Sequence, residues 1–243
     1  MACILHTFTA GGIRCTASLP LSYSDGTDRR YSTVYLMGEM DTVPVMEKLQ
    51  AQLAKTGGQD EVILIGTESG DWNTMFSPWQ EPKLGKNLGP FSGGGVQTLD
   101  ILEHQIKPYV DSVYRTAPDA KHTVLAGYSL AGLLTLYALY NSSSFSRFAC
   151  MSGSLWFPGW VEYAQTHSPE AHNLRIYLSL GDREKDSRNP VMAQVADCTE
   201  KTCILLRTIA GADNVLSVSN PGGHFNDVPE RIAHGIASVL CMK

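Results

Sequence analysis

Thr123-Val-Leu-Ala-Gly-Tyr-Ser-Leu-Ala-Gly132 carries the strongest structural signal in the sequence. Its first residues form an apolar run that ends at Gly127, and Ser129 follows after Tyr128. Leu130 then begins LAGLLTLYALY, which is apolar all round, as expected of a helix buried against a sheet. The stretch therefore predicts a buried strand, a sharp turn that carries Ser129, and a buried helix over Leu130–Tyr140.

This arrangement is typical of a nucleophile elbow, a tight strand-to-helix turn that lifts a serine hydroxyl above the sheet. Small residues two positions before and after the serine keep such a turn free of clashes, and here they are Gly127 and Ala131. The usual pattern has Gly in place of Ala131. We predict that Ser129 is a nucleophile and that the Leu130 N–H donates to an oxyanion. The alternative is a purely structural turn.

The rest of the chain alternates short apolar runs with segments of helical period. Almost continuous apolar strands are typical of a parallel sheet that is covered on both faces. Ile13–Leu19 alternates more, which predicts an antiparallel strand at the edge. The expected strands are Ile13–Leu19, Thr33–Met37, Glu61–Gly66, Thr123–Gly127, Arg147–Met151, Arg175–Leu180 and Cys203–Thr208.

Helices are expected between these strands, over Pro44–Lys55, Val96–Arg115 and Pro229–Leu240 besides the helix after Ser129. Pro108 should kink or break the second of them. The alternation predicts one α/β domain over residues 1–243, with a mostly parallel central sheet and helices on both faces. Gly70–Gly95, rich in Gly, Pro, Trp and Asn, is expected to be a long functional loop.

Composition narrows the class of protein. The 243 residues include 43% apolar and 18% charged residues, with a formal net charge of -5. We therefore expect a folded domain that binds neither nucleic acid nor a membrane surface.

The N-terminal residues lack the pattern of a signal peptide, which favours a cytoplasmic protein. The six cysteines lack the spacing of a zinc site, so no metal is expected. Cys198 and Cys203 are near enough in sequence for a disulfide, but free thiols are the preferred interpretation.

A serine nucleophile needs a base, and the histidine of this class of site comes last in the chain. His224 lies in the Gly-rich segment Asn220-Pro-Gly-Gly-His-Phe-Asn226, between the last expected strand and the last helix. His167 and His172 lie in a polar stretch before the final strands, and His234 lies inside the final helix. We predict His224 as the general base.

The acid that orients the histidine should follow the strand Arg175–Leu180. Three carboxylates stand there, Asp182, Glu184 and Asp186. Glu184 is preferred and Asp182 is the alternative, while Asp186 has neighbouring cations with which to pair. The spacing of the residues leaves this choice open.

Two further groups of residues are candidates for the substrate site. The strand Thr33–Met37 leads into Gly38 and Glu39, and the N–H of either is a candidate second oxyanion donor. Trp79 in the long loop and Trp156 after the strand Arg147–Met151 are expected to offer aromatic faces at the rim of the site. Trp72 and Trp160 lie in similar segments.

Taken together, these segments resemble the putative esterase family of α/β-hydrolases, which includes siderophore (enterochelin-type) esterases. The resemblance rests on Val34-Tyr-Leu-Met-Gly38, Ser77-Pro-Trp79, Gly127-Tyr-Ser-Leu-Ala-Gly132, Met151-Ser-Gly-Ser-Leu-Trp156, Ser179-Leu-Gly-Asp-Arg-Glu184 and Pro221-Gly-Gly-His-Phe225. It implies hydrolysis of a carboxylic ester through an acyl-serine, without metal or organic cofactor. It also favours Glu184, three residues after Gly181. The family's usual Asp-Gly pair is replaced here by Gly38-Glu39.

Three functions are consistent with these features of the sequence. The first is a serine carboxylesterase that acts on a small or medium ester, a siderophore lactone included. The second is a carbohydrate acetyl or feruloyl esterase, and the third is a non-catalytic relative that binds ligands. Candidates for both nucleophile and base are retained in the sequence, which favours an enzyme with a small-molecule ester substrate. No pattern in the sequence indicates an oligomeric state.

Overall fold

The computed structural model describes residues 3–39, 41–55, 61–86 and 88–242. Within these residues the main sheet has the strand order β1-β2-β4-β3-β7-β8-β9-β10. In this order, neighbouring strands from β4 to β10 are parallel, whereas the pairs β1–β2 and β2–β4 are antiparallel. The strands are β1 (Cys3–Ala10), β2 (Ile13–Pro20), β3 (Ser32–Met37), β4 (Val62–Thr67), β7 (Thr123–Tyr128), β8 (Arg147–Met151), β9 (Arg175–Gly181) and β10 (Val215–Asn220).

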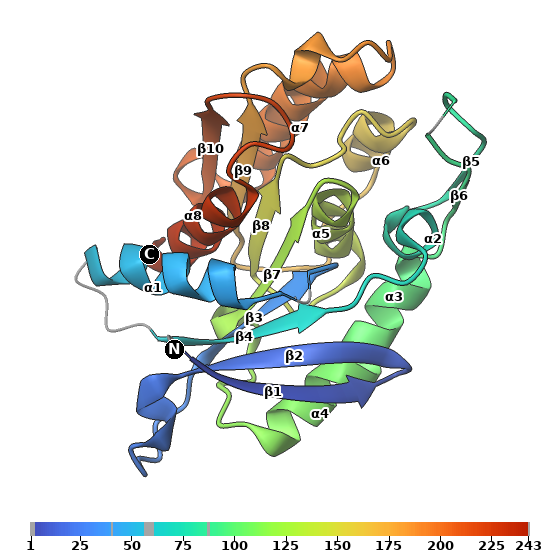
Figure 1. Cartoon of the computed structure of the whole chain (residues 1–243). Helices are drawn as coiled ribbons and strands as arrows, with labels where there is room; N and C mark the ends of the chain where they lie inside the picture. The colour runs from blue at the N-terminus through green and yellow to red at the C-terminus, as the bar shows by residue number, and fades with distance from the viewer. Residues whose placement is uncertain (1–2, 40, 56–60, 87, 243) are drawn as a thin grey trace.

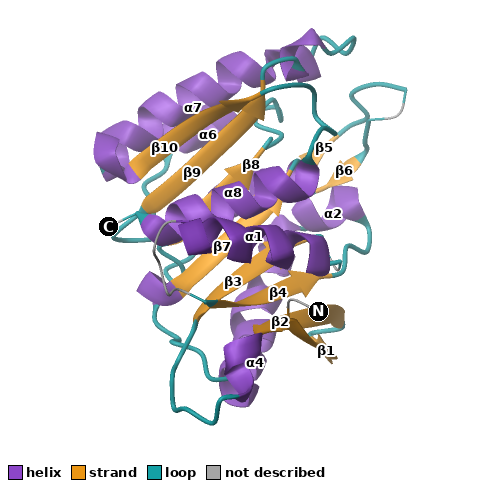
Figure 2. Ribbon diagram, turned by 60° about the vertical axis from the view of Figure 1, so that its left-hand side comes forward, coloured by secondary structure: helices purple, strands orange, loops and turns teal. Residues whose placement is uncertain are grey.

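Helices cover both faces of this sheet (Figure 1, Figure 2). On one face lie α1 (Val43–Lys55) and α8 (Val228–Cys241). The opposite face is covered by α3 (Gly95–Ile101), α4 (Lys107–Val113), α5 (Leu130–Asn141), α6 (Trp160–Thr166) and α7 (Val195–Ala210). Short 3-10 turns occur at Leu21–Ser24, Ala120–His122, Glu184–Asp186, Met192–Gln194 and Ala212–Asn214. The predicted α/β fold, a mostly parallel sheet between helices, is confirmed.

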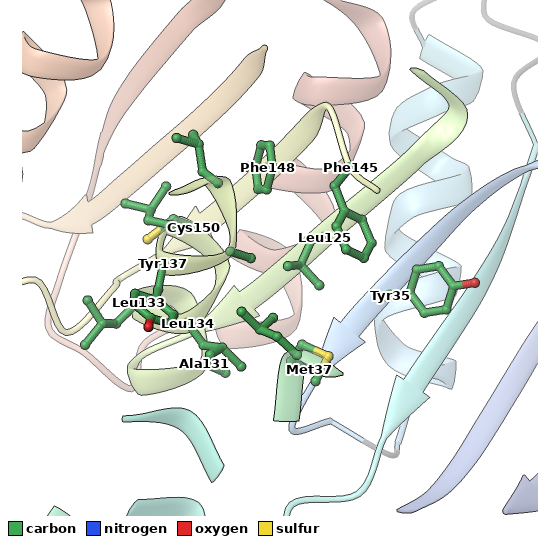
Figure 3. Packing of buried hydrophobic residues seen from close by; sticks show 14 of the residues in the cluster. Tyr35, Met37, Leu125, Ala131, Leu133, Leu134, Tyr137, Phe145, Phe148 and Cys150 are labelled. Atoms are coloured by element: carbon green, nitrogen blue, oxygen red, sulfur yellow. The ribbon is translucent and has the colours of Figure 1, made fainter. Parts of the chain in front are cut away.

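The strands alternate their side chains between two apolar cores. In β3, Val34 and Leu36 pack with α1 and α8, while Tyr35 and Met37 point to the opposite core. Figure 3 shows that second core, in which Leu125 of β7 lies near the apolar side chains of α5. Side chains on both faces of the central strands are apolar and buried, as the sequence indicated for a sheet covered by helices on both sides.

The predicted strand Cys203–Thr208 is wrong, because these residues lie in the middle of the sixteen-residue helix α7. The buried residues of α7 recur at helical spacing and include Val195, Thr199 and Leu206. The last strand is β10, which follows α7 and pairs with β9. The antiparallel strand at the edge is β1, so β2 is second in the sheet and pairs on both sides.

The expected helix Val96–Arg115 is divided into three parts. A π-helical turn over Leu102–Ile106 separates α3 from α4, and Pro108 stands in the first turn of α4. The turn fits the presence of Pro108, which has no N–H to donate within a continuous helix. The segment Gly70–Gly95 is less irregular than expected, since it contains α2 (Trp72–Phe76) and the short pair β5 (Gln80–Glu81) and β6 (Phe91–Ser92). Residue 87 lies outside the described residues.

None of the six cysteines forms a disulfide, so Cys198 and Cys203 are not bonded to each other. In the described part of the chain no helix is both long and apolar enough to cross a membrane. Within the same residues, no group of three or more His, Cys, Asp or Glu side chains is arranged to hold a metal ion.

Candidate active site

Ser129 stands at the tight turn between β7 and α5, in a backbone conformation that is unusual for a side-chain-bearing residue. Its φ is 59° and its ψ is -123°, which is strained geometry of the kind found at nucleophile elbows. The turn is so tight that a Cβ on Gly127 would lie 2.2 Å from the carbonyl oxygen of Ala131. Ala131 itself is fully buried in the core against the sheet, so its methyl group is accommodated.

Three side chains from separate segments form a hydrogen-bonded row above the sheet. Ser129 Oγ lies 3.0 Å from His224 Nε2, and His224 Nδ1 lies 2.6 Å from Glu184 Oε2. They follow β7, β9 and β10, whose parallel directions bring their carboxyl ends to one edge of the sheet. With the ring hydrogen on Nδ1, the imidazole donates to Glu184 and its Nε2 is free to accept the serine proton.

The other two carboxylates after β9 do not contact the imidazole in this structure. Asp182 Oδ1 accepts a hydrogen bond from the Gly222 N–H at 2.8 Å, and so fixes the backbone of the loop that carries His224. Asp186 is exposed at the end of the 3-10 turn that Glu184 begins. The geometry thus joins Glu184 to His224 and gives Asp182 a contact with the loop.

The side chain of Glu184 is only 5% exposed and accepts hydrogen bonds from several groups. Besides His224, it accepts from Ser152 Oγ at 2.7 Å and from the Gly181 N–H at 2.7 Å. Burial acts to raise the pKa of this carboxyl, but the hydrogen bonds from His224, Ser152 and Gly181 outweigh it, and the pKa lies below its usual value of 4.5. Glu184 therefore stays ionised and oriented toward His224 near neutral pH.

A buried arginine, which the sequence analysis did not identify, lies under this row. Arg231 of α8 is 4% exposed, and its Nη1 approaches Glu184 Oε1 at 3.5 Å. Its Nη2 donates to the carbonyl of Pro221 at 2.8 Å, and its Nη1 donates to Tyr128 Oη at 3.3 Å. Tyr128 Oη in turn donates to the carbonyl of His224 at 2.6 Å. The guanidinium of Arg231 thus connects Glu184, the loop that carries His224, and Tyr128, which precedes Ser129.

Backbone N–H groups suited to an oxyanion lie beside Ser129. Leu130 is the first residue of α5, where backbone N–H groups have no partner within the helix. The N–H of Gly38 donates to Thr67 Oγ1 at 3.0 Å and is therefore already occupied. Of the two residues considered from the sequence, this leaves the N–H of Glu39 as the candidate second donor.

A cavity of about 720 Å³ opens at the row of side chains, and its lining is mostly apolar. Ser129, His224 and Glu184 lie in its wall. Its size is within the range usual for sites that bind small molecules. The residues in its wall also include Glu39, Trp72, Phe91, Trp156, Arg183, Asp186, Phe225, Val228 and Ile232.

The tryptophans divide into two groups. Trp72 and Trp156 line the cavity, and the ring of Trp156 lies 6.4 Å from that of Phe91. Trp79 is not among the described residues that line it; its indole N–H donates to the carbonyl of Pro158 and its ring packs on Phe157. Trp160 is fully buried. Trp79 therefore packs the long segment against the core, in place of the expected position at the rim.

The fold and the strand-to-helix turn at Ser129 define an α/β-hydrolase. More specifically, the chain belongs to the family described as Putative esterase, whose sequence profile matches residues 10–224. This family membership indicates a hydrolase that acts on esters. The matched span includes Ser129, Glu184 and His224.

Individual relatives are distant in sequence but alike in structure. The chain is 23% identical to the uncharacterized protein YbbA of Bacillus subtilis over 198 residues, which are 81% of this chain and 79% of that protein. An IroE-like serine hydrolase from Shewanella oneidensis matches with a TM-score of 0.80 at 19% identity, over 96% of this chain and 79% of its own. The siderophore hydrolase EstA of Aspergillus nidulans matches with 0.79 at 18%, over 97% and 93%. These likenesses support the fold.

Proposed function

We propose that this protein is a serine carboxylesterase, with Ser129 as nucleophile, His224 as general base and Glu184 as the acid that orients it. The observation that carries the proposal is the continuous pair of hydrogen bonds, 3.0 Å from Ser129 to His224 and 2.6 Å from His224 to Glu184. A serine hydroxyl is a weak nucleophile until an adjacent base accepts its proton, and this row supplies the base and its orienting carboxylate.

The reaction begins when His224 Nε2 takes the proton of Ser129 as Oγ attacks the ester carbonyl. His224 then returns this proton to the departing alcohol oxygen, and the acyl group remains on Ser129. Water repeats the same steps and releases the acid. Glu184 stabilises the positive charge that forms on His224 during both halves. The route uses only these side chains and water.

The negative charge on the carbonyl oxygen is held by the N–H groups of Leu130 and Glu39 in this proposal. Leu130 lies at the start of α5, where the helix dipole also favours negative charge. The Gly38 N–H is directed at Thr67, which is why Glu39 takes the second position. Loss of one such donor typically costs about 2.7–4 kcal/mol of transition-state stabilisation.

A small or medium ester with apolar groups is the substrate that the cavity supports best. Trp72, Phe91 and Trp156 offer aromatic faces for an acyl group or ring, and the volume of about 720 Å³ admits one small molecule. Because a structural neighbour carries the name siderophore hydrolase, siderophore lactones belong in the first substrate panel. Feruloyl and acetyl sugar esters belong there as well.

The test is a rapid-mixing experiment with p-nitrophenyl acetate and butyrate. On activated esters such as these, acylation of Ser129 is expected to be faster than hydrolysis of the acyl-enzyme, which gives a burst of p-nitrophenol that approaches one equivalent of enzyme, followed by slower steady turnover. Ser129→Ala should abolish both phases, and Ser143→Ala, which changes an exposed serine outside the cavity lining, should keep them. Steady turnover that survives in Ser129→Ala would contradict the proposal.

A further inference from the structure

The residue directly after His224 is a phenylalanine that stands almost free in solvent. Phe225 is 88% exposed, more than any other large hydrophobic side chain in the described part of the chain; the next, Ile204, is 58% exposed. Its ring centroid lies 4.9 Å from that of His224, with the two rings nearly perpendicular at 88°. Phe225 also belongs to the wall of the cavity, so this exposed ring lies at the mouth of the site.

The chemistry of the proposed reaction indicates which part of a substrate meets Phe225. His224 Nε2 has to come within hydrogen-bond reach of the departing alcohol oxygen in order to protonate it. The group attached to that oxygen therefore extends beside the imidazole, where Phe225 stands. Val228 and Ile232, at the start of α8, continue the apolar wall on the chain that follows. Ile232 is only 2% exposed, so an apolar alcohol group would chiefly cover Phe225 and the partly exposed Val228 and remove them from water.

The charges that line the cavity favour an alcohol without negative charge. Apart from Glu184, which is paired with His224 and Arg231, the described residues of the lining carry two carboxylates and one guanidinium. The carboxylates are those of Glu39 and Asp186, and the guanidinium is that of Arg183. An anionic substrate would meet an excess of like charge, which opposes binding.

From these observations we propose that the site takes esters whose alcohol part is bulky, apolar and free of negative charge, with Phe225 as the residue that selects it. The proposal rests on the proposed serine esterase function and specifies its substrate class. Because the alcohol leaves before the acyl-enzyme is hydrolysed, the contribution of Phe225 falls on formation of the acyl-enzyme and appears in kcat/KM.

The experiment compares three butyrate esters that share one acyl group and have primary alcohols of similar reactivity: propyl, phenylpropyl, and phenylpropyl with a para-carboxylate. Wild type should show a kcat/KM about tenfold higher for phenylpropyl than for propyl butyrate, and should lose this preference with the carboxylate. Phe225→Ala should bring the ratio of the two neutral esters close to one. Glu39→Gln combined with Asp186→Asn should raise the rate on the carboxylate ester several-fold.

Ile204→Ala is the matched control, since Ile204 is an exposed apolar residue on α7 outside the lining of this cavity. It should leave the ratio at the wild-type value. Equal kcat/KM for the two neutral esters in wild type, or an equal loss on both in Phe225→Ala, would overturn the proposal while the esterase function stands. Turnover of none of the esters, together with no p-nitrophenol burst, would overturn both.

Discussion

Arg231 and Glu184, the acid proposed to orient His224, form a buried ion pair. Arg231 Nη1 lies 3.5 Å from Glu184 Oε1, and the two side chains are 3% and 5% exposed. The preceding residue of the same helix, Glu230, forms a shorter pair with Lys48 at 2.8 Å, but both of its members are exposed. Because water screens only the exposed pair, these neighbouring contacts should respond very differently to mutation.

Removal of the buried guanidinium should destabilise the protein strongly. Arg231→Met leaves Glu184 without its buried counter-charge and the Pro221 carbonyl without its donor, and we expect a loss of about 3–5 kcal/mol in the free energy of unfolding. Arg231→Lys keeps the charge and should lose less. Urea unfolding followed by circular dichroism measures both values.

Activity separates a positioning role for Arg231 from mere support of the fold. At a temperature where Arg231→Lys remains folded, we expect kcat to fall with KM nearly unchanged, because a misplaced Glu184 affects the reaction and leaves the cavity intact. Glu230→Gln is the control and should change stability only slightly and kcat not at all. Wild-type kcat in folded Arg231→Lys would refute the positioning role.

The ionisation of Glu184 should make stability depend on pH. Its pKa is lower in the folded protein than the usual 4.5, so its stabilising contribution is complete above about pH 4.5 and declines as the pH falls toward the folded-state pKa. Glu184→Gln lacks this contribution. The difference in unfolding free energy between wild type and Glu184→Gln should therefore be largest near neutral pH and shrink in acid.

Urea unfolding at about pH 7 and about pH 4 measures this difference. Glu200→Gln, which changes an exposed glutamate of α7, should follow the wild-type curve. A wild-type advantage over Glu184→Gln that is constant across this range would contradict the assignment of a lowered pKa to Glu184.

Glu184 and Asp182, both of which follow β9, should differ sharply in their effect on catalysis. Glu184→Ala removes the partner of His224 Nδ1, and we expect kcat/KM to fall on the order of a thousandfold or more. Asp182→Ala removes one hydrogen bond to the Gly222 N–H, and a loss of about tenfold at most is expected. Initial rates on p-nitrophenyl butyrate decide between them. The reverse order would make Asp182 the acid.

The two small residues of the elbow should also differ. Gly127→Ala places a methyl group 2.2 Å from the Ala131 carbonyl oxygen, so the turn has to shift and both stability and turnover should be lost. Ala131→Gly restores the commoner pattern at a cost of about 1 kcal/mol in helix propensity, and turnover should persist. Melting temperature and burst amplitude measure the two effects. Full activity in Gly127→Ala would show that the tight turn is dispensable.

The elbow was predictable because its signal is local. An apolar strand, a serine between small residues and an apolar helix follow one another within twenty residues, and β7 and α5 are found there. The Cys203–Thr208 segment shows the limit of such reasoning, since a short apolar run reads equally as a strand or as part of a helix. The helical spacing of Val195, Thr199 and Leu206 over a longer window carries the correct information.

Other features depend on contacts between distant segments, which the sequence does not show. Arg231 is an ordinary residue on a helix until its partners, more than forty residues away in the cases of Tyr128, Ser152 and Glu184, close around it. The sequence likewise left Glu184 and Asp182 as alternatives, because both follow the same strand. Only the three-dimensional path of the loop after β10 brings His224 to Glu184.

The activation of Ser129 can be measured by the intact mass of the protein after brief exposure to a fluorophosphonate. We predict a single adduct on wild type, located on Ser129 by peptide mapping, and no adduct on Ser129→Ala. His224→Ala should react far more slowly, since the serine then lacks its base. Absence of an adduct on folded wild type, or an adduct that persists in Ser129→Ala, would contradict the claim that Ser129 is an activated nucleophile.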